Sequence, residues 1–282
     1  MTGFININKA AGKTSAQAVA AVKRVFGAPC GHMGTLDPMA TGVLPIGIGK
    51  TSRLFPYLLD KTKIYRARFI FGLSTDTLDT TGNVENTTKT IPTENEIRST
   101  LGRFVGKIEQ VPPKFSAKCV DGKRGYQLAR RGVDFSLPSK TVEISAIELI
   151  GRVAENEYEF GINCKGGTYI RSLARDIGAA CGSLAVMSAL TRIASGKFTI
   201  DNSVSVEELL AADDPEKYII PADYAVDYAR LYLTAAQFKK ILDGVYEDYG
   251  FADGVYRVYK ENDFCGIGET KEGRLKIKAY VR

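Results

Sequence analysis

The chain of 282 residues has little of what a metal site or a disulfide framework requires. It contains a single histidine, His32, and five cysteines that are widely scattered, with no Cys-x-x-Cys pair. Structural zinc sites use closely spaced Cys and His, and disulfide frameworks use even sets of cysteines. We therefore expect neither kind of structure, and no metal in the functional site.

Long apolar runs and a targeting leader are also lacking. The start, MTGFININKA, does not have the basic residues followed by an apolar stretch that a signal peptide needs, and no apolar run approaches membrane-spanning length. The hydrophobic content of 44% and the charged content of 25% are those of ordinary soluble globular proteins. We expect a cytoplasmic protein with one large domain, or one large and one small domain.

Acidic residues are scarce in two parts of the chain. Residues 1–70 hold ten basic and two acidic residues, a net charge of +8, and residues 103–131 hold eight basic and two acidic residues, a net charge of +6. Residues 199–228 hold one basic and eight acidic residues, a net charge of −7. Such charge is either solvated surface or the contact area for a polyanion. The second interpretation requires that the basic segments lie together with residues that can carry out a reaction.

The hydrophobic pattern predicts strands and helices without regular βαβ spacing. Capping-box pairs at Thr14 with Gln17 and at Thr93 with Glu96 predict two helix starts, and apolar residues at helical spacing predict a third helix over 169–181. Alternation over 63–71 places Tyr65 on the inward face. Strands are predicted at 4–8, 63–71, 141–149 and 158–164. An α+β fold around a largely antiparallel sheet follows.

The tail after the acidic stretch has a different pattern. Residues 231–242 are predicted to be helical, and the short runs GVYRVYK, DFCGIGE and RLKIKAYV are predicted strands divided by turn residues. This indicates a small β-barrel or meander. We place a domain boundary near residue 228.

The run IGIGKTS resembles the end of a phosphate-binding loop but does not match the whole motif. The motif G-x-x-x-x-G-K-[ST] needs glycine at position 44, where this chain has Leu44. The dinucleotide fingerprint needs a third glycine where the chain has Ser52. Nucleotide binding by this segment is not predicted.

The neighbouring run GHMGTLDPMATG holds a lone carboxylate, Asp37, in a glycine-rich and otherwise basic stretch. A buried carboxylate needs a cation or several hydrogen-bond donors, and Arg171 is our candidate for the cation. The alternative is that Asp37 is a turn residue ahead of Pro38. His32 has a similar alternative as a structural side chain.

The run GHMGTLDPMATGVLPIGIGKTSRL resembles the signature of the bacterial tRNA pseudouridine-55 synthases. Five further motifs follow in the family's order: KIYRA, G-x-x-T-D-T-x-D-x-x-G, PPKFSAKCVDGKRGYQLARRG, CKGGTYIRSLARDIG and LTRIASGKF. The resemblance implies a pseudouridine-synthase fold with a largely antiparallel mixed sheet and flanking helices over residues 1–228. It also implies an RNA-binding insertion at about 110–140 and a small β-rich PUA-like RNA-binding domain over 229–282.

The resemblance implies isomerisation of the uridine at position 55 in the T loop of tRNA, without a cofactor. The isomerisation moves the uracil from N1 to C5 with the same atoms, so a carboxylate nucleophile on a flipped-out base suffices in principle. The roles implied are Asp37 as nucleophile, Arg171 as its ion-pair partner, Tyr65 as stacking residue and candidate base, His32 against the RNA loop, Tyr169 and Leu190 as pocket walls, and Lys9 as a substrate-binding residue.

Two positions depart from the family pattern. Ala10 follows Lys9 where proline is common, and Cys119 stands where lysine is common. The first weakens the role carried over to Lys9, and the second weakens any single phosphate contact in the insertion. The expected partner is the T arm of tRNA, bound by a monomer.

Three other functions remain open at this point. A basic face and a small β-domain would serve an RNA-binding or RNA-folding module without catalysis. A synthase could act on another target, such as an rRNA uridine, and a P-loop NTPase is the third. The sequence also leaves open whether Asp37 attacks C1′ of the sugar or C6 of the base, or removes a sugar proton.

Overall fold

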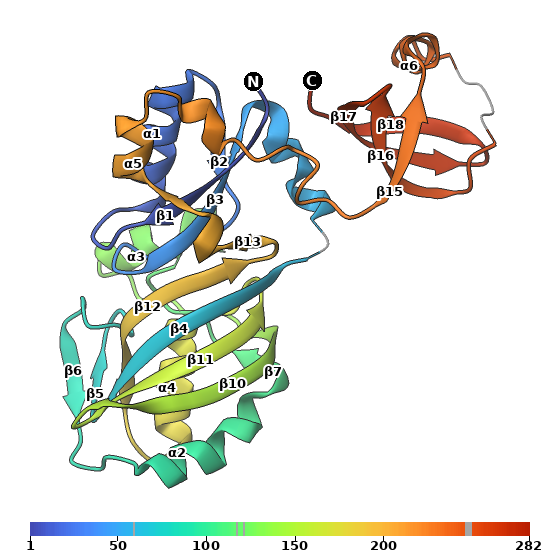
Figure 1. Ribbon diagram of the computed structural model, residues 1–282. Helices are drawn as coiled ribbons and strands as arrows, with labels where there is room; N and C mark the ends of the chain where they lie inside the picture. Colours follow the sequence, from blue (N-terminus) through green and yellow to red (C-terminus); the bar gives the residue numbers. More distant parts are fainter. Residues whose placement is uncertain (59, 117, 121, 246–249) are drawn as a thin grey trace. The chain divides into compact units, whose positions relative to one another are not determined.

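The structure is a computed structural model that describes residues 1–282 apart from Leu59, Ala117, Asp121 and residues 246–249. The chain forms two compact units (Figure 1). The first unit comprises residues 1–38, 42–61 and 195–282, and the second comprises residues 39–41 and 62–194. In the part of the chain that is described, no helix combines the length and the apolar character needed to cross a membrane.

The first unit is built on three short ladders. Strand β1 (Gly3–Lys9) pairs in parallel with β14 (Val204–Ser205) and antiparallel with β3 (Thr41–Ile48), and β2 (Cys30–His32) pairs antiparallel with β3. Helix α1 (Ser15–Phe26) packs on β1 and on α5 (Val206–Ala211).

The predicted start of α1 is confirmed. Thr14 caps the helix, and its side chain and that of Gln17 form the reciprocal capping box. The helix ends at Gly27, whose φ of 60° lies in the left-handed region that glycine adopts without steric cost.

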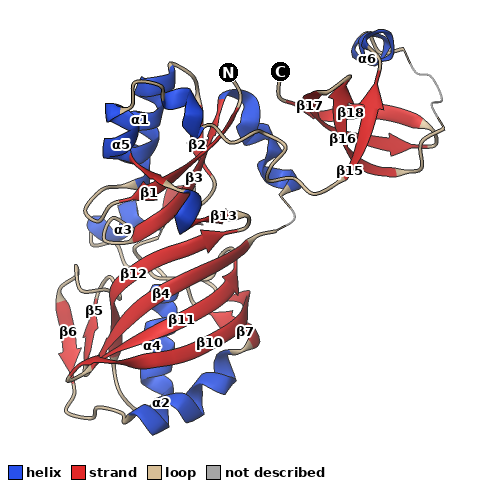
Figure 2. Cartoon of the chain, in the orientation of Figure 1, coloured by secondary structure: helices blue, strands red, loops and turns tan. Residues whose placement is uncertain are grey.

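The second unit contains five neighbouring strands of one larger sheet, in the order β12 (Ala185–Ser195), β4 (Thr62–Phe71), β11 (Glu157–Lys165), β10 (Lys140–Ala154) and β7 (Gly106–Gln110). The ladders from β4 to β7 are antiparallel. Helix α4 (Ile170–Ala180) packs on β4, and α2 (Glu94–Leu101) packs on β10 and on α4, so both cover one face of the sheet (Figure 2). The α+β arrangement with a mixed, largely antiparallel sheet is therefore confirmed.

Several short elements complete the two units. They are β5 (Leu73–Thr75), β6 (Val84–Thr87), β8 (Cys119–Val120), β9 (Lys123–Arg124), β13 (Phe198–Thr199), α3 (Gly125–Arg130) and the 3₁₀ turns η1 (Gly49–Tyr57), η2 (Gly102–Phe104), η3 (Ile200–Asn202) and η4 (Pro215–Tyr218). Strands β5 and β6 form a hairpin, as do β8 and β9.

The C-terminal residues of the first unit form a separate sheet in the order β15 (Ala229–Leu233), β16 (Gly254–Lys260), β17 (Asp263–Lys271) and β18 (Arg274–Tyr280). The helix predicted over 231–242 is wrong in its first part, because α6 spans only Ala235–Leu242. Leu231 and Leu233 are buried while Tyr232 is exposed, which is the alternation of a strand.

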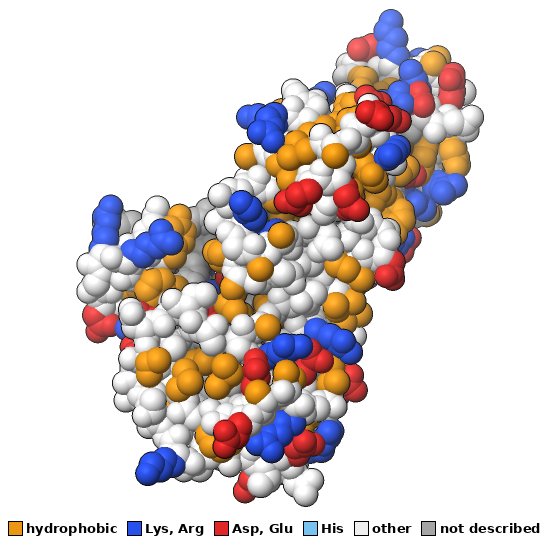
Figure 3. All heavy atoms as spheres, turned by 60° about the vertical axis from the view of Figure 1, so that its left-hand side comes forward, with side chains coloured by type: hydrophobic (Ala, Val, Ile, Leu, Met, Phe, Trp, Pro, Cys, Tyr) orange, Lys and Arg blue, Asp and Glu red, His pale blue; other side chains and the backbone are white. Residues whose placement is uncertain are grey.

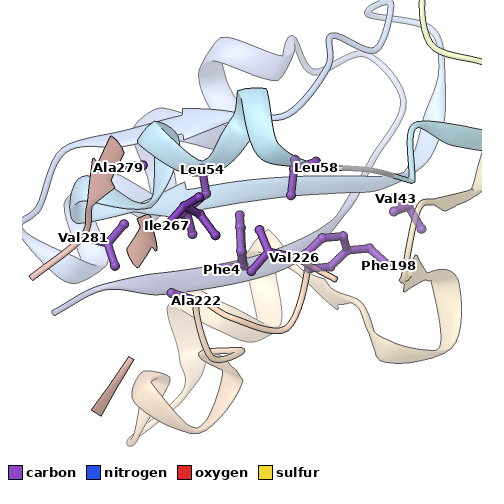
Figure 4. Packing of buried hydrophobic residues seen from close by; sticks show 10 residues of the cluster. All are labelled: Phe4, Val43, Leu54, Leu58, Phe198, Ala222, Val226, Ile267, Ala279 and Val281. Atoms are coloured by element: carbon purple, nitrogen blue, oxygen red, sulfur yellow. The ribbon is translucent and has the colours of Figure 1, made fainter. Parts of the chain in front are cut away.

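This C-terminal sheet shares a hydrophobic core with η1 (Figure 4). Leu54 of η1 lies in the same cluster as Ile267 of β17 and Ala279 of β18. The other buried members are Phe4, Val43, Leu58, Phe198, Ala222, Val226 and Val281. Polar contacts join the same elements, since Arg53 of η1 donates to the carbonyl of Tyr280 at 3.1 Å. The C-terminal sheet therefore contributes to the stability of the first unit.

We expect Ile267→Ala to lower the free energy of unfolding by about 2–5 kcal/mol, the usual cost of truncating a fully buried aliphatic side chain. Ile267 is completely buried in the shared core. Urea denaturation measures the change. Lys276→Ala on the exposed side of β18 is the control and should stay within about 0.5 kcal/mol of wild type. An equally small loss for Ile267→Ala would contradict the shared core.

Candidate active site

The loop that carries Asp37 is fixed on both sides of that residue. The hydroxyl of Ser15, at the start of α1, donates to the carbonyl of Leu36 at 3.0 Å and accepts from the Leu36 N–H at 2.9 Å. The carbonyl of Pro38 accepts from the N–H of Gly12 at 2.9 Å. Asp37 itself is half-buried. The backbone on both sides of this carboxylate therefore has little freedom left to lose when the carboxylate reacts.

Lys9 provides a further contact to this loop. Its side chain is only 1% exposed, and its ammonium donates to the carbonyls of Ala10 at 2.8 Å, Lys13 at 2.7 Å and Pro38 at 3.2 Å. A buried ammonium is costly unless it is hydrogen-bonded, and these bonds meet that need. The placement makes Lys9 a residue that positions the Asp37 loop. A contact of Lys9 with RNA stays a prediction.

We expect Lys9→Met to lower the rate of the chemical step by about tenfold or more, because a small displacement of a reacting group is expensive in rate. Single-turnover kinetics on the RNA substrate measures this rate. Lys13→Met removes the same charge from an exposed side chain in the same loop and should leave the rate near wild type. Equal rates for the two variants would show that Lys9 does not position the loop.

His32 lies at the end of β2, opposite Ile46 of β3. Its side chain is half-buried. The first unit thus carries three of the residues singled out from the sequence: Asp37, Lys9 and His32.

The second unit carries Arg171 on the first turn of α4. Its side chain is almost fully buried, and its guanidinium donates to the carbonyl of Thr77 at 2.9 Å and to the carbonyl of Phe115 at 3.1 Å. The same guanidinium lies 3.6 Å from Oδ2 of Asp79, which is 4% exposed. Arg171 is therefore held by two segments that are distant from it in the sequence, residues 77–79 and Phe115.

Sequence reasoning missed Asp79. Its carboxylate accepts from the Thr77 hydroxyl at 2.8 Å, from the Thr81 N–H at 3.0 Å and from the Thr81 hydroxyl, and its carbonyl accepts from the Thr75 hydroxyl at 2.7 Å. The signal available was the run T-D-T-x-D between two glycines, which holds two acids. The run does not tell which acid is buried, and Asp76 instead binds the N–H of Asn83 in the turn.

Tyr65 points inward from β4, as predicted. It is 6% exposed, lies opposite Ile162 of β11, and belongs to the strand on which α4 packs. Tyr169 is the N-cap residue of α4 and is half-buried. Leu190 is buried on β12, and its carbonyl accepts from the hydroxyl of Thr41 at 3.5 Å. The second unit thus carries Tyr65, Tyr169, Arg171 and Leu190.

In the basic segment after β7, most of the Lys and Arg side chains that the structure describes are exposed. Lys114 forms an ion pair with Asp134 at 2.8 Å, and the guanidinium of Arg130 lies 5.7 Å from the centre of the Tyr126 ring. Asp121, one of the two acids counted over residues 103–131, lies outside the described residues. Figure 3 shows one face of the molecule, on which Lys and Arg side chains lie among Asp and Glu side chains.

Metal ligands do not gather anywhere in the described residues. No group of three His, Cys, Asp or Glu side chains there is close enough to hold a metal ion.

Burial raises the pKa of the Cys164 thiol to about 11, which keeps this side chain in its neutral form at physiological pH.

Comparison with solved structures defines the class of fold. The structure of an H/ACA ribonucleoprotein bound to a substrate RNA containing 2′-deoxyuridine matches with a TM-score of 0.71 and 22% sequence identity. The match covers 99% of this chain and 85% of the other. The match shows that the two chains share one fold over nearly the whole of this chain.

Comparison with sequence families is more specific. Residues 23–170 match the model of the TruB family pseudouridylate synthase N-terminal domain, and residues 171–227 match that of the tRNA pseudouridylate synthase B C-terminal domain. A tRNA pseudouridine synthase B of Clostridium kluyveri is 39% identical over the full length of both chains. One from Anaplasma marginale is 42% identical over 82% of this chain and 77% of its own. The chain belongs to the TruB family of pseudouridylate synthases.

Proposed function

We propose that this enzyme converts the uridine at position 55, in the T loop of tRNA, to pseudouridine with Asp37 as the nucleophile. The observation that carries the proposal is the fixed loop around Asp37 in a member of the TruB family, whose relatives are tRNA pseudouridine synthases. The isomerisation of a uridine in tRNA follows from the family. The target position and the residue roles are our proposal.

The reaction rearranges one nucleotide without a net change in its atoms. The bond from C1′ to N1 breaks, a bond from C1′ to C5 forms, a proton leaves C5 and N1 gains one. An ionised carboxylate can attack covalently and divide this change into two easier steps. Attack at C1′ and attack at C6 make the same demand on Asp37, because both need a charged oxygen in a fixed place.

Arg171 is proposed as the cation that pairs with Asp37 and orients its carboxylate. A guanidinium has five N–H donors in a rigid fork, so it can hold a carboxylate while it also binds backbone carbonyls. The contacts of Arg171 with Thr77, Phe115 and Asp79 support this role, because they fix the guanidinium before substrate arrives.

The target uridine must leave its loop to reach a carboxylate, and this requires a surface for the extruded base. We assign the stacking surface to Tyr65, which is also the candidate base for the C5 proton, and the pocket walls to Tyr169 and Leu190. His32 is assigned to the rearranged RNA loop. The burial of Tyr65 and Leu190 supports apolar walls rather than phosphate contacts.

The remaining proposals concern the domains, the location in the cell, the oligomeric state and the RNA partner. We propose a catalytic domain over 1–228 with an RNA-binding insertion at about 110–140, and a PUA-like RNA-binding domain over 229–282. The family matches end at residue 227, and the separate C-terminal sheet begins at Ala229, which supports this boundary. The enzyme is proposed to act as a cytoplasmic monomer on the T arm of tRNA, with phosphate contacts that weaken as salt rises.

The test is incubation with an unmodified tRNA transcript, followed by chemical labelling that maps pseudouridine along the RNA. We expect one modified nucleotide, at position 55, and none in a transcript with cytidine there. An rRNA panel run beside it separates other targets. Modification only at a different uridine would overturn the proposed position, and binding without modification would favour an RNA-binding module.

A further inference from the structure

The start of α4 is held by a side chain from the edge of the sheet. Gln110 is the last residue of β7 and is only 1% exposed. Its Oε1 accepts from the N–H of Tyr169 at 2.8 Å, and its Nε2 donates to the carbonyl of Tyr169 at 3.1 Å. Only one orientation of the carboxamide satisfies both bonds, so the contact fixes the side chain as well as the backbone.

Helix α4 depends on this contact because its own sequence does not supply a cap. Tyr169 occupies the N-cap position, and no side chain caps the helix there. In a capping box the side chain three residues later accepts from the N-cap N–H. That residue is Ser172, whose hydroxyl donates to the carbonyl of Val111 at 2.8 Å instead. Gln110 therefore supplies, from another strand, the acceptor that the helix lacks.

The residue after Gln110 strengthens the same attachment. The carbonyl of Val111 accepts from Ser172 and also from the guanidinium of Arg175 at 3.1 Å. Val111 precedes Pro112, which restricts its backbone to extended conformations. The two residues Gln110 and Val111 thus form a stiff support for the first two turns of α4.

Two proposed site residues depend on where that helix begins. Tyr169 is the residue that Gln110 binds, and Arg171 lies two positions further on. A shift of the helix start would move the guanidinium away from the Thr77 and Phe115 carbonyls that it binds at 2.9 and 3.1 Å. A displacement of this kind changes the rate of the chemical step more than the affinity for tRNA, because it misplaces the reacting groups.

We infer that Gln110 is a positioning residue for the isomerisation, acting through the Tyr169 backbone to fix the side chains of Tyr169 and Arg171. The inference rests on the proposed function, in which these two side chains belong to the site. It assigns to Gln110 an effect on the chemical step and not on RNA binding.

Gln110→Met tests the inference, because methionine has nearly the same size and makes neither hydrogen bond. We expect the single-turnover rate to fall about tenfold or more. The dissociation constant for tRNA should stay within about twofold of wild type, since no proposed RNA contact is removed. Glu109→Gln is the matched control, an exposed residue of the same strand, and should keep the wild-type rate.

Gln110→Glu gives a second readout that a merely structural role would not move. An ionised carboxylate can accept from the Tyr169 N–H, but it repels the Tyr169 carbonyl. A protonated carboxyl can donate to that carbonyl as glutamine does, and burial raises its pKa. The rate relative to wild type should therefore rise by about threefold or more as the pH is lowered from about 8 to about 6.

Each outcome decides between the claims. A wild-type rate for Gln110→Met, or a loss confined to tRNA affinity, overturns the inference. If Gln110→Met does not fold, the rate of Gln110→Glu relative to wild type decides alone. A relative rate that does not change with pH overturns the inference. Arg171→Ala in the same assay distinguishes a failure of the proposed function from a failure of the role inferred for Gln110. Full activity there would refute the proposed role of Arg171, whereas impaired Arg171→Ala beside fully active Gln110→Met would refute only the role of Gln110.

Discussion

Arg171→Ala is expected to lower the rate of pseudouridine formation by about 10²–10³-fold, the usual cost of removing a fixed group that stabilises charge in a buried site. Two effects add. The proposed partner Asp37 loses its cation, and the carbonyls of Thr77 and Phe115 lose the guanidinium that joins them. Single-turnover kinetics measures the rate, with tRNA binding measured separately.

The same substitution leaves the carboxylate of Asp79 buried without its cation. Removing one partner of a buried ion pair costs about 3–5 kcal/mol, so the free energy of unfolding should also fall. Arg171→Lys keeps the charge but not the planar fork, and should recover stability more than activity. Arg98→Ala, on the half-exposed side of α2, is the control and should keep the wild-type rate. A wild-type rate for Arg171→Ala would remove the ion pair from the mechanism.

Asp37→Asn is expected to bind tRNA with nearly wild-type affinity and to lose activity by at least about 10⁴-fold, as in enzymes that lose their nucleophile. Asparagine has the same shape, so the loop fixed by Ser15 and Lys9 should persist. It carries no charge and is a poor nucleophile. Asp60→Asn, the other acid in the first 70 residues, is the control and should stay active.

Local patterns in the sequence were sufficient for much of the fold. The alternation over 63–71 predicted β4 with Tyr65 inward, and the capping pair of Thr14 and Gln17 predicted the start of α1. Each signal lies within a few residues, where propensity and side-chain period act directly. Leu231 shows the limit of such patterns. Its two-residue alternation with Leu233 lies too close to the helix that follows to be separated by period alone.

Contacts between distant segments could not be predicted in the same way. The ion pair of Asp79 with Arg171 and the bonds of Gln110 with Tyr169 join residues more than fifty positions apart. No local pattern encodes such pairs. Lys9 shows a third case, because lysine is rarely buried and only the fold shows that its ammonium binds backbone carbonyls.

The candidate site followed from motifs more than from composition. Asp37 was predicted both from a chemical reason, a lone carboxylate in a basic stretch, and from the family resemblance. The roles of Tyr169, Leu190 and His32 rest on the resemblance and on their places in the two units, and their functions stay predictions.

The role of Asp37 as nucleophile can be decided by the pseudouridine content at position 55 of tRNA after a single turnover with excess Asp37→Asn enzyme. We expect full conversion by the wild-type enzyme and none by this variant, although both hold the RNA. Conversion at the wild-type rate by Asp37→Asn would contradict this role.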